Sequence, residues 1–276
     1  MPAHAAADVL ATCIGGVGDL ALVQRLHAVE QQLINTATGY HQLALAQSLH
    51  QVPRVQGVGA VTRAELEALY AKQMSAIGGA ARAIYDALRN APSNGKCPLC
   101  GIGTVAVLDH HLPKARYPDL SVCPFNLVPA CDFCNNAKRA RFPTSAEEQT
   151  LHPYYDDFTP EQWIYAQLYT AGSPVLVFQV NAPAHWPHVA RQRAKRHFDV
   201  VKLGQSYTSN ANDDLIPLRG HLERIAATKG AADLQAYLLE EQARYAPRLN
   251  SWQHVMYQTL AGDAWFVGGG YLTIPQ

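Results

Sequence analysis

The sequence predicts an α+β fold, in which a small cysteine-rich module is embedded in a mostly helical chain. Apolar residues recur at helical spacing in residues 1–92 and again in residues 151–276. The segment between them, residues 93–150, is rich in Cys, His, Pro and Asn and contains two CxxC pairs. Apolar residues make up 48% of the 276 residues and charged residues 16%, which excludes a disordered chain.

The overall charge limits the classes of partner. Lys plus Arg and Asp plus Glu both number 22, so any nucleic-acid site must be a local basic patch. Residues 114–141 contain such an excess, with five basic and two acidic side chains. No apolar run approaches ~18 residues, and residues 1–18 lack the basic start of a signal peptide. We therefore expect a cytoplasmic protein with no membrane partner, in which clustered cysteines bind metal rather than form disulfides.

The N-terminal region, residues 1–92, is predicted to contain three helices. One apolar stripe steps by four, three and four residues through Leu22, Leu26, Val29 and Leu33. Thr62 and Glu65 have the spacing of a capping box, which predicts that a second helix begins there. A third helix is expected over residues 80–88.

The remaining elements follow in order. In the middle segment we expect a strand over residues 104–108 and a helix over residues 130–139. In the C-terminal region, residues 151–276, Thr159, Pro160 and Gln162 have the pattern of a helix start. A strand is expected over residues 175–180. Further helices are expected over residues 188–203, 213–228, 231–245 and 250–260.

The two CxxC pairs predict a structural metal site. Cys97 and Cys100 form one pair, and Cys131 and Cys134 form the other. Two residues between thiolates let both sulfurs of a tight turn face one ion, and two such turns supply the four tetrahedral ligands of Zn²⁺. Such a closed site stabilises the fold and leaves no position for chemistry. The alternative is that the cysteines are redox-active or merely buried.

A second motif lies between the cysteine pairs and just after them. It consists of Asp109-His110, Pro113, Asn126-Leu127 and Cys131-Asp132-Phe133-Cys134-Asn135 followed by Lys138. This order resembles the four-cysteine form of the HNH (ββα-metal) nuclease family over about residues 96–142. The surrounding sequence, residues 82–155, also resembles in a general way HNH proteins that are encoded among bacterial anti-phage defence genes. The resemblance implies a ββα-metal module within residues 93–150.

The resemblance also implies roles for individual residues. His110 would be the general base, Asp109 and Asn135 would be ligands of one catalytic Mg²⁺ or Mn²⁺, and Asn126 would fix the loop or the His110 ring. The chemistry agrees, because a neutral His can deprotonate water and oxygen ligands suit a hard divalent ion. The chain departs from the family pattern at His111, so the sequence leaves His111 as the alternative base.

Three basic side chains are candidates for phosphate contact: Lys114, Lys138 and Arg139. On the predicted helix Arg139 lies four residues after Asn135 and shares its face, with Lys138 beside it. The alternative is that all three are ordinary solvated charges.

The function expected from these features is metal-dependent hydrolysis of nucleic acid, DNA in preference to RNA. One alternative is a zinc-ribbon module that binds nucleic acid without catalysis. Another is an effector that is gated by a regulatory protein such as an ATPase. Only ~45–50 residues carry the nuclease motif. The other helices therefore have another role, for which substrate recognition, partner docking and self-association are the alternatives.

Overall fold

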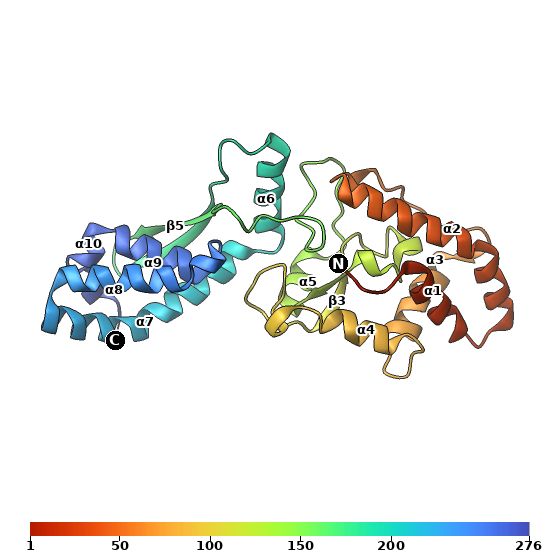
Figure 1. Cartoon of the computed structure of the whole chain (residues 1–276), viewed down its shortest axis with the longest axis horizontal. Helices are drawn as coiled ribbons and strands as arrows, with labels where there is room; N and C mark the ends of the chain where they lie inside the picture. The colour runs from red at the N-terminus through yellow and green to blue at the C-terminus, as the bar shows by residue number, and fades with distance from the viewer. Residues whose placement is uncertain (276) are drawn as a thin grey trace. The chain divides into compact units, whose positions relative to one another are not determined.

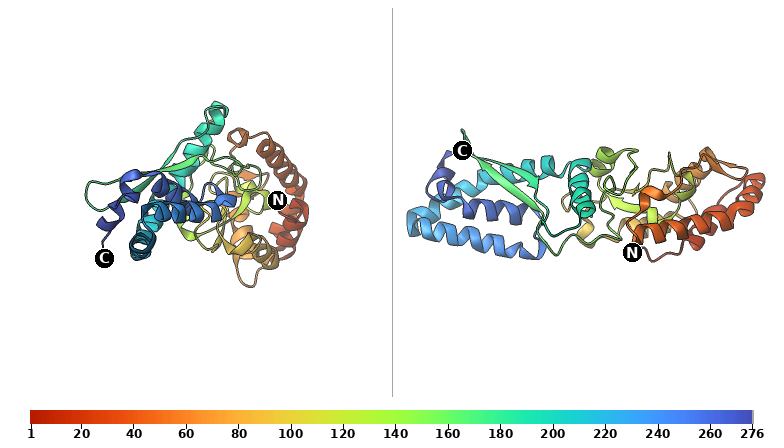
Figure 2. Two further views of the ribbon diagram at one scale, coloured as in Figure 1. Left: turned by 60° about the vertical axis from the view of Figure 1, so that its left-hand side comes forward. Right: turned by 90° about the horizontal axis from the view of Figure 1, so that it is seen from above.

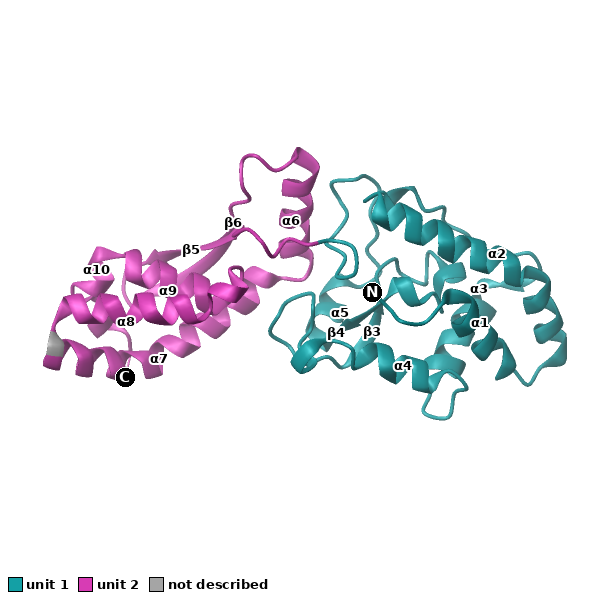
Figure 3. Ribbon diagram, in the orientation of Figure 1, with its two compact units in different colours: residues 1–156 teal, residues 157–276 magenta. Residues whose placement is uncertain are grey.

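A computed structural model of the chain describes residues 1–275 (Figure 1). The chain divides into two compact units, unit 1 over Met1–Asp156 and unit 2 from Asp157 onward (Figure 3). Unit 1 contains both the predicted N-terminal region and the cysteine-rich segment. The structure is dominated by helices, with three two-stranded sheets among residues 1–275. No helix within that range has both the length and the apolar character to cross a membrane.

The N-terminal part of unit 1 is helical, as the sequence predicted. Asp19 caps the long second helix by accepting hydrogen bonds from Ala21 N and Leu22 N. Thr62 and Glu65 form the predicted capping box, in which each side chain accepts from the backbone N–H of the other. A short hairpin of β1, Gly57–Val58, and β2, Val61–Thr62, precedes it. The helices are α1 Ala6–Gly15, α2 Leu20–Leu45, α3 Arg63–Ala68, a π-helical turn Leu69–Ser75 and α4 Arg82–Arg89.

The cysteine-rich segment forms two strands and a short helix. Strand β3, Val107–His110, pairs antiparallel with β4, Leu127–Ala130, and α5, Asp132–Lys138, follows. The strand predicted over residues 104–108 begins only at Val107. The cause is local: Val105 N donates to Gly95 O and Cys97 N to Gly103 O, so these residues build the first cysteine turn instead.

The main core of unit 1 joins the helices to this small sheet. Buried apolar side chains of α1, α2, α3 and α4 form one cluster with Leu108 of β3 and Leu127 of β4. In Figure 1, β3 and α5 lie together beside α4. Burial of such a cluster favours folding by roughly 25 cal/mol per Å² of apolar surface. The N-terminal helices therefore support the sheet that carries Asp109 and His110.

Unit 2 consists of a hairpin packed on helices. Strands β5, Ile164–Tyr169, and β6, Val175–Val180, pair antiparallel, and the hairpin lies alongside α7 and α9 (Figure 2). The strand predicted over residues 175–180 is confirmed. The helices are α6 His188–Val200, α7 Leu203–Lys229, α8 Ala231–Arg244, α9 Trp252–Gly262 and α10 Ala264–Val267.

One helix predicted in unit 2 is absent, and another, over residues 213–228, is confirmed but begins earlier. No helix starts at Thr159: its N–H donates to Asp157 Oδ1, and the N–H groups of Trp163 and Ile164 donate to Asn250 Oδ1 as β5 begins. The helix expected over residues 213–228 begins at Leu203 instead, directly after α6. Lys202 separates the two helices because its backbone is left-handed, with φ of 55°.

Candidate metal centre and active site

The four predicted zinc ligands come together. The Sγ atoms of Cys97, Cys100, Cys131 and Cys134 all lie within 4.8 Å of one another, and all four residues are buried. The backbone makes this close approach possible at Gly103, where an added Cβ would lie 2.7 Å from Cys131 Sγ. Hydrogen bonds from other thiols, first that of Cys100, lower the pKa of Cys131 well below its usual range. This group can hold a metal ion such as zinc, since thiolates are the ligands that a tetrahedral Zn²⁺ site requires.

His110 is buried at the end of β3 in one defined orientation. Its Nε2 lies 2.8 Å from the carbonyl oxygen of Ser121, so Nε2–H donates and Nδ1 keeps the lone pair. The ring of Tyr70 packs edge-on, with centroids 4.5 Å apart. Burial lowers the pKa of His110 to about 3. The imidazole is therefore neutral near pH 7, which is the state that a general base needs.

His111 has different surroundings, although it is the next residue. Its backbone N–H donates to Asn126 O at 2.8 Å, and its ring lies 4.1 Å from the ring of His152. His152 Nε2 in turn lies 3.0 Å from the hydroxyl of Tyr40 on α2. The two adjacent histidines thus contact different elements, which gives a structural basis for separating their roles by mutation.

Asn126 fixes the loop that follows β3. The side chain is fully buried, and its Oδ1 accepts from Leu112 N at 2.7 Å. Its Nδ2 donates to Leu112 O at 3.0 Å and to Leu120 O at 3.3 Å. Asn126 therefore holds both ends of loop 112–120 together through its side-chain hydrogen bonds.

Asp109 is paired with Lys138. The Lys138 ammonium lies 3.0 Å from Asp109 Oδ2 and 3.3 Å from Oδ1, and it donates to His110 O at 2.6 Å. Lys138 is only 4% exposed. Burial raises the pKa of Asp109, and the Lys138 charge opposes that rise. In this conformation Lys138 is therefore not on the surface where a phosphate would meet it.

The other sequence-predicted residues lie on α5, at its end and in the loop after β3. Asn135 is half-buried on α5, one residue after the ligand Cys134. Lys114 places its ammonium 4.9 Å from the centroid of the Tyr70 ring. Arg139 is exposed and ends α5 with φ of 53°, a conformation that is costly for a residue other than Gly.

Sequence reasoning missed three residues that support the site, two through their side chains and Ser121 through its backbone carbonyl. Tyr70 contacts the His110 ring and donates its hydroxyl to Leu108 O. Tyr154 donates its hydroxyl to Leu127 O at 2.8 Å. Ser121 provides the carbonyl that orients His110. None of the three belongs to a recognisable motif, so nothing in the sequence marked them.

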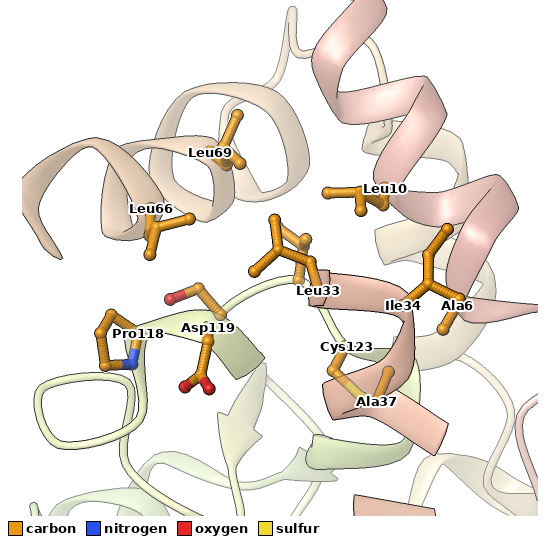
Figure 4. A pocket seen from close by; sticks show the side chains of 12 residues that line it. Ala6, Leu10, Leu33, Ile34, Ala37, Leu66, Leu69, Pro118, Asp119 and Cys123 are labelled. Atoms are coloured by element: carbon orange, nitrogen blue, oxygen red, sulfur yellow. The ribbon is translucent and has the colours of Figure 1, made fainter. Parts of the chain in front are cut away.

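A small cavity lies between the N-terminal helices and the turn formed by residues 118–123 (Figure 4). Its volume is about 20 Å³, which is room for one water molecule. Side chains of α1, α2 and α3 form its apolar wall, and Asp119 and Ser121 face it from the turn. Among residues 1–275, Asp119 Oδ1 and Ser121 Oγ have no hydrogen-bond partner. Burial raises the pKa of Asp119 to about 6.

Comparison with known proteins gives one strong relationship. No protein-family model matches the chain. No solved structure matches it. The chain is 33% identical to Protein ea31 of Escherichia phage lambda over 260 residues, which is 88% of this chain and 87% of the phage protein. At that identity and coverage, the chain belongs to the Ea31 family of phage lambda.

Proposed function

We propose that this protein is an HNH-type endonuclease that hydrolyses phosphodiester bonds in nucleic acid, DNA in preference to RNA. The observation that carries the proposal is the setting of His110. It is a buried, neutral imidazole whose Nε2–H is held by Ser121 O, and it directly follows Asp109 on β3. It lies on a β3–β4–α5 unit next to four clustered cysteines, in the order that the HNH motif predicts.

The proposed chemistry uses His110 as the general base. A water molecule attacks phosphorus while its proton passes to Nδ1 of His110. The new P–O bond forms as the bond to the leaving sugar oxygen breaks, and the Ser121 carbonyl stabilises the imidazolium through Nε2–H. A divalent ion, when bound, supplies positive charge for the transition state and the leaving oxygen. Asn126 holds loop 112–120 in place through its hydrogen bonds to Leu112, and thereby positions the end of β3 that carries His110.

The donor set for Mg²⁺ or Mn²⁺ fits only in part. Asp109 and Asn135 offer the hard oxygen atoms that such ions prefer. Both Asp109 oxygens, however, lie within 3.3 Å of the Lys138 ammonium. Asp109 could hold a divalent ion only if the Lys138 ammonium left it, and Lys138 would then be available for substrate phosphate.

The same ion pair favours a second candidate function. If Lys138 stays on Asp109, the buried carboxylate is already neutralised and has no charge to offer a metal. The protein would then be a zinc-stabilised module that binds nucleic acid without cutting it.

Plasmid nicking separates the two functions. Under the nuclease proposal, wild-type protein nicks plasmid with Mg²⁺ or Mn²⁺, and His110→Ala loses at least ~10²-fold in rate. His111→Ala is the matched control, because it removes the neighbouring imidazole but not the one on Ser121 O. Loss of activity in His111→Ala with full activity in His110→Ala would assign the base to His111. No nicking by wild-type protein that still binds DNA would favour the non-catalytic function.

Regulation by a partner is an extension of the proposal. All candidate site residues belong to unit 1, so unit 2 is free to dock a regulatory protein such as an ATPase or a second copy of the chain. The relative Ea31 is a phage protein. We therefore propose that a nuclease regulated in this way acts during phage infection, including as an anti-phage effector. Nicking that is weak with the protein alone and strong with its partner would support this extension.

A further inference from the structure

Two exposed guanidinium groups flank one aromatic ring in unit 1. Cζ of Arg54 lies 5.1 Å from the centroid of the Phe142 ring, and Cζ of Arg116 lies 5.8 Å from the same centroid. Both distances are within the range of cation–π attraction. The three residues come from segments far apart in the sequence, so the tertiary fold brings them together.

The ring that joins them is held in place by the core. Phe142 packs against a buried cluster that includes Tyr117 and Leu120, and the Tyr117 ring meets it edge-on at 6.2 Å. Arg116 lies in the loop that Asn126 ties, and its N–H donates to Pro113 O at 2.8 Å. The ring and the Arg116 backbone therefore form a preorganised platform.

Neither guanidinium has a carboxylate partner among residues 1–275. Six other arginines do: Arg25, Arg63, Arg82, Arg89, Arg219 and Arg244 all lie within 3.3 Å of an Asp or Glu oxygen. Within residues 1–275, Arg54 and Arg116 form no ion pair, and both are exposed. Two like charges on one ring repel each other, and a bound anion between them relieves that repulsion.

The pair is close to the proposed catalytic base along the chain. Arg116 follows His110 by six residues, which span at most ~20 Å. That length corresponds to about six nucleotide steps of 3.4 Å along one strand. Lys114 of the same loop lies over Tyr70, whose ring contacts His110. The loop therefore carries positive charge from the His110 site toward Phe142.

We propose that Arg54 and Arg116, held on Phe142, form a clamp for the phosphate backbone of nucleic acid. The proposal rests on the proposed function, since it assigns the clamp to the substrate of the same site. A guanidinium offers paired N–H donors that match two oxygens of one phosphate. Arg54 lies in the N-terminal region, outside the HNH-like motif, so this part of unit 1 contributes to substrate binding and not only to support.

The test is the salt dependence of DNA binding. Fluorescence anisotropy with a labelled 30-base-pair duplex in EDTA measures binding without cleavage. Each of Arg54→Gln and Arg116→Gln should reduce the slope of log K against log salt by about one. By counterion release alone, each variant should bind about fivefold more weakly at 0.15 M salt. The matched control is Arg63→Gln, an exposed arginine of the same unit that is paired with Glu67 and should leave the slope unchanged.

The outcomes distinguish this clamp from the nuclease proposal. If both variants keep the wild-type slope while retaining zinc and Tm, the clamp proposal is wrong, whatever the protein cleaves. If wild-type protein binds no duplex or single-stranded nucleic acid, the proposal is also wrong. If the slopes fall as expected but no metal supports nicking, the clamp stands and only the catalytic proposal fails. Phe142→Leu, which keeps both charges, should weaken binding less than either glutamine variant.

Discussion

Among single residues, the buried Asp119 makes the stability of the protein depend on pH. Its folded-state pKa is raised to about 6, above the ordinary 3.8, because the carboxyl is buried beside the cavity. Between these values the folded state binds more protons than the unfolded state. Stability therefore falls as the pH rises from about 4 to 6 and stays reduced at pH 7.

Replacing the Asp119 carboxyl should remove this loss of stability at neutral pH. We expect Asp119→Asn to raise the free energy of unfolding at pH 7 by up to a few kcal/mol, with no gain near pH 4. Urea unfolding at pH 4.5, 6 and 7.5 measures the difference between variant and wild type. Ser121→Ala, which alters the same cavity without a titrating group, should show no such pH dependence. A variant less stable than wild type at pH 7 would contradict the assigned cause.

Lys138 provides a second prediction at this scale. Lys138→Met leaves the buried carboxylate of Asp109 unpaired, and breaking a buried pair in this way costs about 3–5 kcal/mol. We expect a lower Tm without divalent ions and a larger rise in Tm on adding Mn²⁺ than wild type shows. Thermal unfolding with and without 5 mM Mn²⁺ measures both.

The double variant Asp109→Asn/Lys138→Met serves as the control for metal binding at this position. It should lose the Mn²⁺ response, because the charge that attracts the ion is gone. An equal Mn²⁺ response in all three proteins would show that the ion binds elsewhere.

At the scale of elements, the first cysteine turn depends on Gly103. A Cβ at this position would lie 2.7 Å from both Cβ and Sγ of Cys131, closer than real contacts allow. Gly103→Ala should therefore push the two turns apart, reduce the zinc content of purified protein and lower Tm, because metal binding contributes folding free energy. Elemental analysis and thermal unfolding measure these effects.

A helical glycine provides the matched control. Gly39 lies on α2, and a Cβ there meets nothing within 4 Å. Gly39→Ala should keep all of the zinc and stabilise the protein by about 0.5–1 kcal/mol through helix propensity. Full zinc content and wild-type Tm in Gly103→Ala would mean that the cysteine turns do not need this close approach.

At the scale of the whole molecule, the candidate zinc ligands, His110 and the Arg54–Phe142–Arg116 clamp all belong to unit 1. We expect a fragment of residues 1–156 to fold cooperatively and to retain the metal of the full chain. Circular dichroism melting and zinc content of the fragment test this. A fragment that is unfolded with zinc present would show that unit 2 is required for the core of unit 1.

Features that depend on neighbours along the chain could be predicted from the amino-acid sequence. The capping box of Thr62 and Glu65 follows from their spacing of three residues. The strand at residues 175–180 likewise follows from a short local run of residues. The two CxxC pairs predicted a metal site for the same reason, because the spacing within each pair sets where its sulfurs point. The predicted helix start at Thr159 failed, because Asn250 and Asp157 bind the backbone there in an extended form.

Contacts between residues far apart in the sequence depend on the tertiary fold. Lys138 and Asp109 are 29 positions apart, and their pairing follows from how α5 packs beside β3. The contact of Arg54 with Phe142 likewise spans two unrelated segments. Such contacts depend on how the elements pack around a shared core. A charge that is buried away from water must be paired, whereas an exposed charge can remain unpaired. No local pattern encodes that choice, so the sequence predicted which side chains are candidates for the site but not the cation that lies on the Asp109 carboxylate.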